Sequence, residues 1–204
     1  HYVIDIWFET VVKTHCRGRV EMFRYGDDLV VCCQYEHDAR RIARAFKGRL
    51  GKFNLRLNEE KTKLVAFDKK NVRSKNKPGT FDFLGLTFYW GCSRQGKPIP
   101  KVKTCGKRLR SKLKKVNRWG RAIRNKYPMS KIWKIFSQKL GGHIRYYGVS
   151  FNLMAIQRFR YQARRILFKH LNRRSQRKSC NWEKFEQYEK AHPLPEARIY
   201  HALF

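Results

Sequence analysis

Acidic side chains are missing from a long stretch of this chain of 204 residues. Residues 83–182 hold 27 lysines and arginines but no aspartate or glutamate, and the formal net charge of the whole chain is +33. A solvated surface normally mixes both signs, and so much charge of one sign repels itself in a compact protein. A polyanionic partner relieves that repulsion, so this composition favours a protein that binds nucleic acid.

Long apolar runs and cysteine motifs are also lacking. No stretch is apolar over the about 20 residues that a membrane-spanning helix needs, and no signal-peptide pattern is visible. The six cysteines include no C-x-x-C pair and no zinc-ligand spacing. We therefore expect a reduced, cytoplasmic protein with no membrane partner. An anionic membrane surface is disfavoured because the basic segments also carry a core-type apolar stripe. Since the chain begins at His1, inside an apolar pattern, we expect a fragment of a longer protein.

The most informative stretch is 21–33, where two apolar runs flank Gly26 and Asp27. This pattern predicts a β-hairpin with a type II′ turn, in which Gly26 takes a positive φ. The turn presents two adjacent carboxylates, Asp27 and Asp28. Carboxylate oxygens suit Mg²⁺, and two such ions can hold the attacking and leaving oxygens of a phosphoryl transfer. The alternative is a solvated acidic turn without a ligand.

The first half, residues 1–100, is predicted to form a small α+β layer. The second strand of the hairpin, 29–33, is apolar on both faces, so we expect it inside a sheet. The patterns predict helices at 1–12 and 36–50, a basic link at 13–19, a turn at 58–60, a strand at 62–67, a loop at 68–80 and a strand at 81–90.

The second half, residues 101–204, is predicted to be an all-α basic bundle. Apolar residues recur there every three or four positions. The pattern predicts a long helix that ends before Pro128 and three more that start at the N-cap candidates Ser130, Asn152 and Asn181. No internal repeat is visible.

Several separated stretches resemble one family, the reverse transcriptases and maturases encoded by group II introns. Residues 25–28, Tyr-Gly-Asp-Asp, resemble the Tyr-x-Asp-Asp motif. Residues 57–63 resemble the palm segment that follows this motif, and residues 83–86 resemble the primer-grip strand. Residues 142–148, 171–176 and 193–199 resemble the thumb, or maturase, domain.

This resemblance covers nearly the whole chain and implies a fold and an activity. It implies the C-terminal part of a polymerase palm at 1–100, an antiparallel sheet with helices, followed by an all-α thumb or maturase domain at 101–204. The implied activity is RNA-directed DNA synthesis with two Mg²⁺ ions, together with binding of intron RNA to assist splicing. The implied partners are the intron RNA, the template–primer duplex and, in the full-length protein, a deoxynucleoside triphosphate.

Site roles follow from the resemblance by position. The implied metal-binding and catalytic carboxylates are Asp27 and Asp28. The residues implied beside the nucleotide and template are Tyr25, Gly26 and Lys61, although Lys61 reads equally well as a surface lysine. The residues implied to support the primer end are Phe83, Leu84 and Gly85.

The basic clusters and one aromatic residue of the second half are candidate RNA contacts, because cations neutralise phosphates and aromatic rings stack on unpaired bases. They are Arg108, Arg110, Lys112, Lys114, Lys115, Arg118, Arg121, Arg145, Tyr146, Arg173, Arg174, Arg177 and Lys178. Tyr147 and Trp182 are also aromatic, but for these two we favour core packing.

Two features of the sequence depart from the family pattern and affect whether we expect polymerase activity. Gly26 stands where this family usually has alanine, and Gly-Asp-Asp is also typical of viral RNA-dependent RNA polymerases. The polymerase site also needs a carboxylate from an earlier strand, and the only earlier aspartate, Asp5, lies in a helical pattern. We therefore expect that the fragment does not polymerise alone, which primer extension by residues 1–204 would contradict. A non-catalytic RNA-binding maturase module and, less favoured, a viral-type RNA polymerase fragment are the alternatives.

Overall fold

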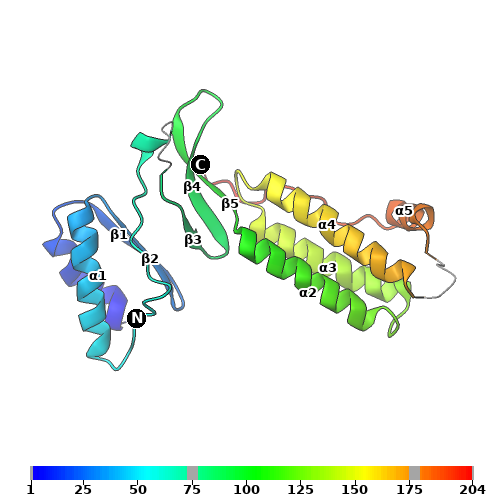
Figure 1. Ribbon diagram of the computed structural model, residues 1–204, viewed down its shortest axis with the longest axis horizontal. Coiled ribbons are helices and arrows are strands. Elements are labelled where there is room, and N and C mark those ends of the chain that lie inside the picture. Colours follow the sequence, from blue (N-terminus) through cyan, green and yellow to red (C-terminus); the bar gives the residue numbers. More distant parts are fainter. Residues whose placement is uncertain (1, 73–77, 175–179, 204) are drawn as a thin grey trace. The chain divides into compact units, whose positions relative to one another are not determined.

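The computed structural model describes residues 2–72, 78–174 and 180–203. The chain has an α+β fold, as the sequence predicted. Its contacts divide it into two compact units (Figure 1). The first unit comprises His1–Leu84 and Tyr89–Ile99, and the second comprises Gly85–Phe88 and Pro100–Phe204.

The first unit begins with a helical segment. Tyr2–Ile6 and Phe8–Val12 are π-helical turns, and Lys13–His15 is a turn of 3₁₀ helix. Of the predicted helix at 1–12, residues 2–12 are described and are helical, and helical turns continue to His15, where the sequence had suggested a link. Phe8 and Val12 are buried on one side of this segment.

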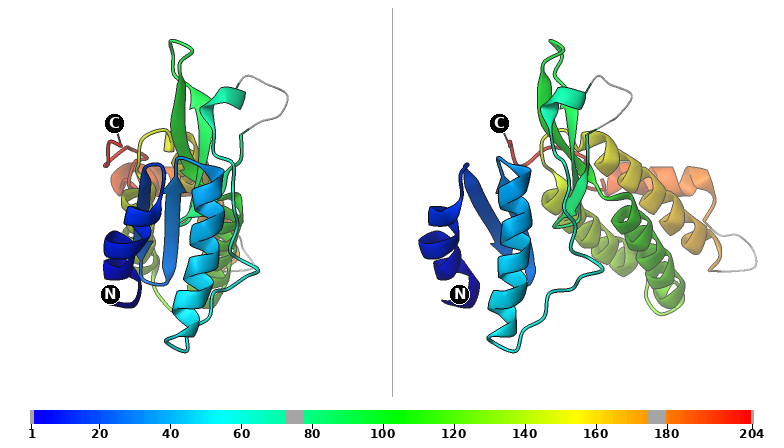
Figure 2. Two further views of the ribbon diagram at one scale, coloured as in Figure 1. Left: turned by 90° about the vertical axis from the view of Figure 1, so that its left-hand side faces the viewer. Right: turned by 60° about the vertical axis from the view of Figure 1, so that its left-hand side comes forward.

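The predicted hairpin and helix follow. Strand β1, Val20–Tyr25, pairs antiparallel with β2, Asp28–Cys33, and Tyr25 lies opposite Asp28. Helix α1, Glu36–Gly51, packs alongside β2 (Figures 1 and 2). The core between these elements consists of Phe8, Val12, Val20, Ile42 and Phe46.

Two strand predictions in the first unit are wrong. In the part of the chain that the structure describes, β2 has only β1 as a hydrogen-bonded neighbour, and Cys32 is exposed. Strand β2 is therefore not interior to a sheet. Residues 62–67 form no strand, because their backbone hydrogen bonds to described residues are only those from the Thr62 amide to the Asn58 carbonyl, at 3.0 Å, and from the Gly79 amide to the Ala66 carbonyl, at 2.9 Å.

A second sheet has the strand order β3–β4–β5. Its strands are Phe81–Phe83, Leu86–Cys92 and Pro98–Thr104. Strand β5 was missed in the sequence, where residues 101–104 were assigned to the helical half. Pro98 and Pro100 argue against an interior strand because proline donates no hydrogen bond, but an edge strand such as β5 tolerates them.

The described residues of the second unit form four helices. They are α2, Gly106–Ile123, α3, Met129–Tyr147, α4, Leu153–Asn172, and α5, Trp182–Ala191. Helices α2, α3 and α4 lie side by side (Figures 1 and 2). Their buried centre includes Ile132, Phe136, Ile144, Ile156 and Phe159.

The capping predictions have mixed outcomes. The Asn181 side chain caps α5 by accepting a hydrogen bond from the Lys184 amide at 3.0 Å, as predicted. Ser130 is not an N-cap, since α3 begins at Met129 and Pro128 occupies the cap position. Asn152 stands at the N-cap of α4, but its side chain makes no cap hydrogen bond.

The segment after α5 returns along the helices (Figure 1). Its Leu194 is buried, and its Pro195 carbonyl accepts a hydrogen bond from Arg160 Nε at 2.9 Å. Near its end it forms a parallel bridge between His201 and Val149. Within residues 2–72, 78–174 and 180–203, no helix combines the length and the apolar character needed to cross a membrane.

A half-buried histidine in the second unit makes stability depend on pH. The His143 ring stacks on Phe159 with centroids 3.5 Å apart, and its Nε2 has no hydrogen-bond partner among the described residues. Burial, with the Lys112 charge as a second cause, lowers the pKa of His143 from 6.5 to about 4. Between those values the unfolded chain binds a proton that the folded chain does not, so stability falls as the pH falls through this window.

We expect the free energy of unfolding to drop by about 2 kcal/mol between pH 7.5 and pH 5 from His143 alone. Replacing His143 with phenylalanine keeps the ring contact and should remove this part of the pH dependence. Urea unfolding of both proteins at the two pH values measures it. An equal drop in the His143→Phe variant would show that other groups cause the pH dependence.

Candidate functional site

The tip of the β1–β2 hairpin presents the two candidate metal ligands to solvent. Gly26 has φ of 60° and Asp27 does not have a positive φ, as a type II′ turn requires. Asp27 and Asp28 are exposed, and Tyr25 is 70% exposed. In the described part of the chain, neither carboxylate accepts a hydrogen bond or forms an ion pair. Both oxygen pairs are therefore available to a hard cation such as Mg²⁺.

Arg24 connects this turn to the first helical segment through hydrogen bonds. Its Nε and Nη2 donate to the two oxygens of Asp5 at 2.7 and 2.5 Å, and its Nη1 donates to the Gly26 carbonyl at 3.1 Å. The hydrogen bonds from Arg24 hold the pKa of Asp5 below its usual value. Asp5 thus serves as the partner of Arg24, in a helical turn, and not as a third carboxylate on a strand.

No third ligand joins the two aspartates. Among the described residues, no group of three or more His, Cys, Asp or Glu side chains is placed to hold a metal ion. Two exposed carboxylates suit a divalent ion whose other ligands are water or substrate oxygens. The residues present fit part of a metal site of that kind.

Lys61 is exposed in the turn that follows α1. Its amide bonds to the Asn58 carbonyl and side chain, both at 3.2 Å, so the predicted turn at 58–60 is present. The Lys61 ammonium group has no hydrogen bond or ion pair with any described residue. An exposed ammonium group of this kind fits both interpretations of Lys61, as a residue beside the nucleotide and as a surface lysine.

The predicted primer-grip residues form a tight turn between β3 and β4. Leu84 and Gly85 have φ of 51° and 79°. Two consecutive positive φ angles are typical of a type I′ hairpin turn, and leucine adopts such an angle only at a cost. A side chain at Gly85 would meet Tyr147 Oη, which lies 2.7 Å from the position of a Cβ atom. Phe83 is half-buried at the end of β3.

A buried polar network, absent from the sequence analysis, lies behind this turn. The Gly85 carbonyl accepts from the Cys105 amide at 2.9 Å. The preceding residue, Thr104, donates its amide to Asn152 Oδ1 at 2.7 Å, and Asn152 Nδ2 donates to the Tyr147 carbonyl at 2.8 Å. Asn152 thereby joins the ends of β5, α3 and α4. The position of Asn152 before an apolar helical pattern had suggested an N-cap. Only the tertiary contacts show that its side chain instead connects these three elements.

The candidate RNA-binding residues of α2 are all exposed. None of them forms an ion pair with a carboxylate in the described chain, since the ion pairs of the second unit involve Arg160 and Arg164 on α4. Helix α2 therefore carries uncompensated positive charge. These residues are Arg108, Arg110, Lys112, Lys114, Lys115, Arg118 and Arg121.

Charge on α4 is divided between two faces. Arg160 and Arg164 face α5, where Arg164 Nε binds Glu189 Oε2 at 2.6 Å. Exposed Arg158, Arg165, Lys169 and Arg173 have no carboxylate partner among the described residues. Of this group, only Arg173 was predicted from the sequence as an RNA contact, although the spacing 165, 169 and 173 already indicates one helical face.

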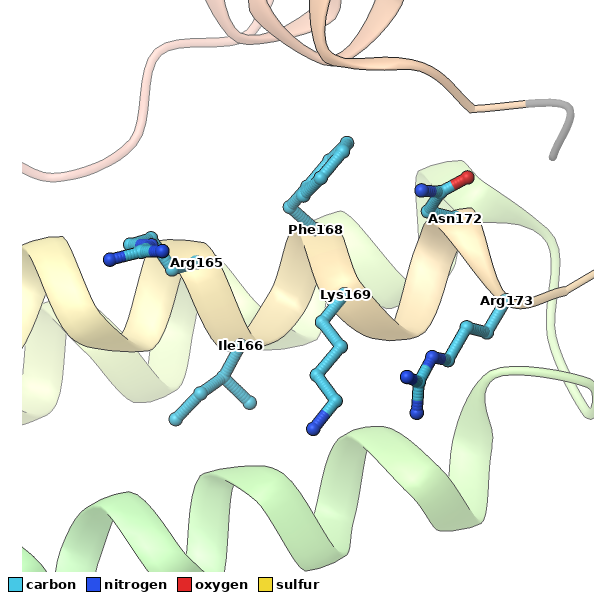
Figure 3. Close-up of a pocket in the computed structure, with 6 residues that line it drawn as sticks. All are labelled: Arg165, Ile166, Phe168, Lys169, Asn172 and Arg173. Carbon is cyan, nitrogen blue, oxygen red and sulfur yellow. The ribbon is translucent and has the colours of Figure 1, made fainter.

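Figure 3 shows the residues that line an open depression on α4, among them Arg165, Lys169 and Arg173 of this face. Lys169 and Arg173 project to one side of the helix, and Phe168 and Asn172 project to the other. The depression is therefore an exposed surface of mixed character and not an enclosed ligand cavity. Lys169 and Arg165, which line this depression, therefore belong to the basic surface of the second unit.

The remaining candidate RNA contacts differ in their exposure and in the hydrogen bonds that they already make. Arg145 is exposed in the last turn of α3, and Tyr146 is 56% exposed. Arg174 is half-buried and donates through Nη2 to the Tyr127 carbonyl at 2.9 Å, so it connects α4 to the turn after α2. Arg177 and Lys178 lie outside the described residues, as do Ser175 and Gln176.

The two aromatic residues assigned to core packing lie against other rings. Tyr147 is 4% exposed. The Trp182 ring packs edge-on against Phe168, with centroids 4.6 Å apart, and stacks on Phe185 at 5.6 Å. Arg164 covers the Trp182 ring at 4.6 Å. Tyr147 is therefore buried, and Trp182 belongs to the contact between α4 and α5 although it stays 38% exposed.

Comparison with known proteins concerns the first half of the chain. The family model described as reverse transcriptase (RNA-dependent DNA polymerase) matches residues 2–88. This range includes the hairpin, Lys61 and the β3–β4 turn. Members of this family bind a nucleic-acid template and normally use a divalent metal ion. Neither the search of curated proteins nor the search of solved structures returned a match.

Proposed function

We propose that this chain is the C-terminal palm and the thumb of a reverse transcriptase encoded by a group II intron, and that it binds intron RNA to assist splicing. The single observation that carries the proposal is the match of residues 2–88 to the reverse transcriptase family. The boundary between palm and thumb is proposed near residue 100. The basic bundle that follows is what a thumb needs in order to hold a phosphate backbone.

The proposed roles rest on exposed charges and on the half-buried turn between β3 and β4. Asp27 and Asp28 would hold Mg²⁺, which when bound neutralises charge that develops in phosphoryl transfer. Tyr25 and Gly26 would lie beside the nucleotide and template, and Lys61 would approach the triphosphate. Phe83, Leu84 and Gly85 would support the primer end on their stiff turn. The exposed cations of α2 and α4 would neutralise backbone phosphates.

RNA binding by the purified chain, titrated against salt, tests the proposal. We compare structured group II intron RNA with duplex RNA of equal length. The proposal expects tighter binding to the intron RNA, with the preference retained as salt rises. Equal binding that collapses with salt would indicate a general phosphate contact instead of a maturase.

A pair of charge-matched variants locates the binding surface. Replacing Lys114 and Arg118 on α2 with glutamine should weaken duplex binding about tenfold and lower the salt slope by about two, because two phosphate contacts are lost. Replacing exposed Lys69 and Lys70 of the first unit with glutamine removes the same charge and should change binding much less. Equal losses in both variants would place the contact elsewhere.

Two alternative functions predict different outcomes in a primer-extension assay. A non-catalytic RNA-binding module would bind intron RNA and still fail to extend a primer after an upstream palm strand that carries the third aspartate is joined to it. A viral-type RNA polymerase would extend primers with ribonucleotides in place of deoxynucleotides. Primer extension with each nucleotide class, in the chain joined to such a strand, distinguishes both from the proposed enzyme.

A further inference from the structure

The two aspartates at the tip of the β1–β2 hairpin have no cationic partner among the described residues, although the chain is rich in cations. The sequence holds 48 lysines and arginines against 15 acidic residues. Arg24 is the nearest of these cations along the chain, three residues before Asp27. Neither Asp27 nor Asp28 forms an ion pair with it or with any other described side chain. Another contact of Arg24 must therefore hold its charge away from them.

Asp5 binds the Arg24 guanidinium in a bidentate pair. Arg24 Nε donates to Asp5 Oδ1 at 2.7 Å, and Arg24 Nη2 donates to Asp5 Oδ2 at 2.5 Å. Two parallel bonds of this kind fix the plane of the guanidinium as well as its position. The side chains of Arg24 and Asp5 are 30% and 20% exposed, so salt screens this pair less than it screens a pair on an open surface.

The third nitrogen of the same guanidinium bonds to the backbone of the turn. Arg24 Nη1 donates to the Gly26 carbonyl at 3.1 Å. With Asp5 on one edge and this carbonyl on the other, all three guanidinium nitrogens make hydrogen bonds. None of these bonds uses an oxygen of Asp27 or Asp28. Arg24 thus lies beside the turn without occupying either of its two carboxylates.

The choice of partner for Arg24 matters for a metal ion at this turn. A pair between Arg24 and Asp27 or Asp28 would use the carboxylate oxygens that a hard divalent cation needs as ligands. A metal ion would then have to break the pair before it could bind. Asp5 removes this competition from a helical turn that lies 19 residues before Arg24 in the chain.

We propose that Asp5 is a positioning residue for the proposed metal site: it holds Arg24 against the Gly26 carbonyl and so keeps the oxygens of Asp27 and Asp28 available to a divalent cation. This inference rests on the proposed function, which assigns these two aspartates to the metal. Asp5 acts through Arg24 and does not itself contact the cation. Its role therefore differs from that of the third carboxylate that a polymerase site needs.

Terbium(III) luminescence tests the role of Asp5 in the 204-residue chain. Tb³⁺ is a hard cation that takes oxygen ligands, as Mg²⁺ does, and the ring of Tyr25 beside the aspartates can sensitise its emission. The signal of the site is the part that Mg²⁺ displaces and that the double variant Asp27→Asn/Asp28→Asn loses. Asp5→Asn should weaken this binding about fivefold, because the released Arg24 then forms an exposed ion pair of about 1 kcal/mol with the aspartates.

A second substitution separates positioning from a merely structural role. In Asp5→Asn/Arg24→Gln the competing cation is absent and the net charge equals that of the unaltered chain. Since the strand pairing of Tyr25 with Asp28 still closes the hairpin, Tb³⁺ affinity should return to within about twofold of its original value.

Glu9→Gln is the matched control for the single substitution. It removes one negative charge from the same helical segment, where Glu9 pairs with Lys13 at 2.9 Å and not with Arg24. This variant should leave the Tb³⁺ affinity nearly unchanged. Urea unfolding of each variant identifies the conditions in which it is folded, and the titrations are made there.

The outcomes separate this inference from the proposed function. Equal Tb³⁺ affinity in the unaltered chain and in Asp5→Asn would overturn the role of Asp5 and leave the metal role of the two aspartates standing. A loss in Asp5→Asn that the added Arg24→Gln does not restore would also overturn it, because Asp5 would then only support the fold. Absence of any Tb³⁺ binding through Asp27 and Asp28 in the unaltered chain would overturn both the proposed metal site and this inference.

Discussion

Replacing Asn152 with alanine is expected to lower the free energy of unfolding of the second unit by about 3 kcal/mol. Asn152 is 1% exposed. Its Oδ1 accepts from the Thr104 amide at 2.7 Å, and its Nδ2 donates to the Tyr147 carbonyl at 2.8 Å. Alanine leaves the buried Thr104 amide without a partner, which costs about 1–3 kcal/mol, and also removes one of the two hydrogen bonds to the Tyr147 carbonyl, which still accepts from the Val149 amide at 2.8 Å.

Urea unfolding followed by circular dichroism measures this loss. Asn125→Ala, the same substitution at an exposed position after α2, is the matched control and should change stability by no more than about 0.5 kcal/mol. Equal small effects at both positions would mean that the network around Asn152 contributes no net stability. This network lies next to the Gly85 turn, so unfolding of the variant would also disturb that turn. RNA binding by Asn152→Ala should therefore be assayed only under conditions in which the variant is folded.

Replacing Gly148 with alanine should destabilise the second unit by about 2 kcal/mol, because it crowds a closely packed backbone. A Cβ atom there would lie 2.7 Å from the Ile144 carbonyl oxygen and 2.9 Å from that of Arg198. Carbonyl groups of the backbone cannot move aside as a flexible side chain can. The C-terminal segment should therefore detach and become sensitive to trypsin at Arg198.

Gly142→Ala provides a control of opposite sign. Gly142 lies within α3, and a Cβ atom there would meet nothing within 4 Å. Alanine at an exposed position inside a helix is more favourable than glycine by up to about 1 kcal/mol, so this variant should be more stable. Thermal unfolding of the two variants should shift in opposite directions. Destabilisation by both would show that the helix, and not the C-terminal segment, requires glycine.

The parts of the fold that sequence alone predicted are those set by local chemistry. The apolar period of three and four residues indicated α1, α2, α3, α4 and α5, since each of these helices buries one face. Gly26 between two apolar runs indicated the hairpin, because glycine takes the required positive φ without strain. Where a sequence pattern was weak or contradictory, as in β5 with its two prolines, the prediction failed.

The candidate site divides in the same way. Sequence identified the exposed carboxylates Asp27 and Asp28 and the basic residues of α2, because charge and turn position are properties of a short stretch. It did not show that Asp5 would bind Arg24, or that Arg174 would bind the Tyr127 carbonyl. These partners lie far away along the chain, and no local pattern specifies them.

Sequence by itself thus determined the helices α1 to α5, the hairpin with its two aspartates, and the accumulation of positive charge after residue 82. Only the tertiary structure decided which charges remain available. Arg160 and Arg164 are neutralised by α5, whereas Arg165 and Lys169 on the same helix meet no carboxylate among the described residues. The reason is physical: pairing of charges depends on distance in space, and docking of α5 and the C-terminal segment sets those distances.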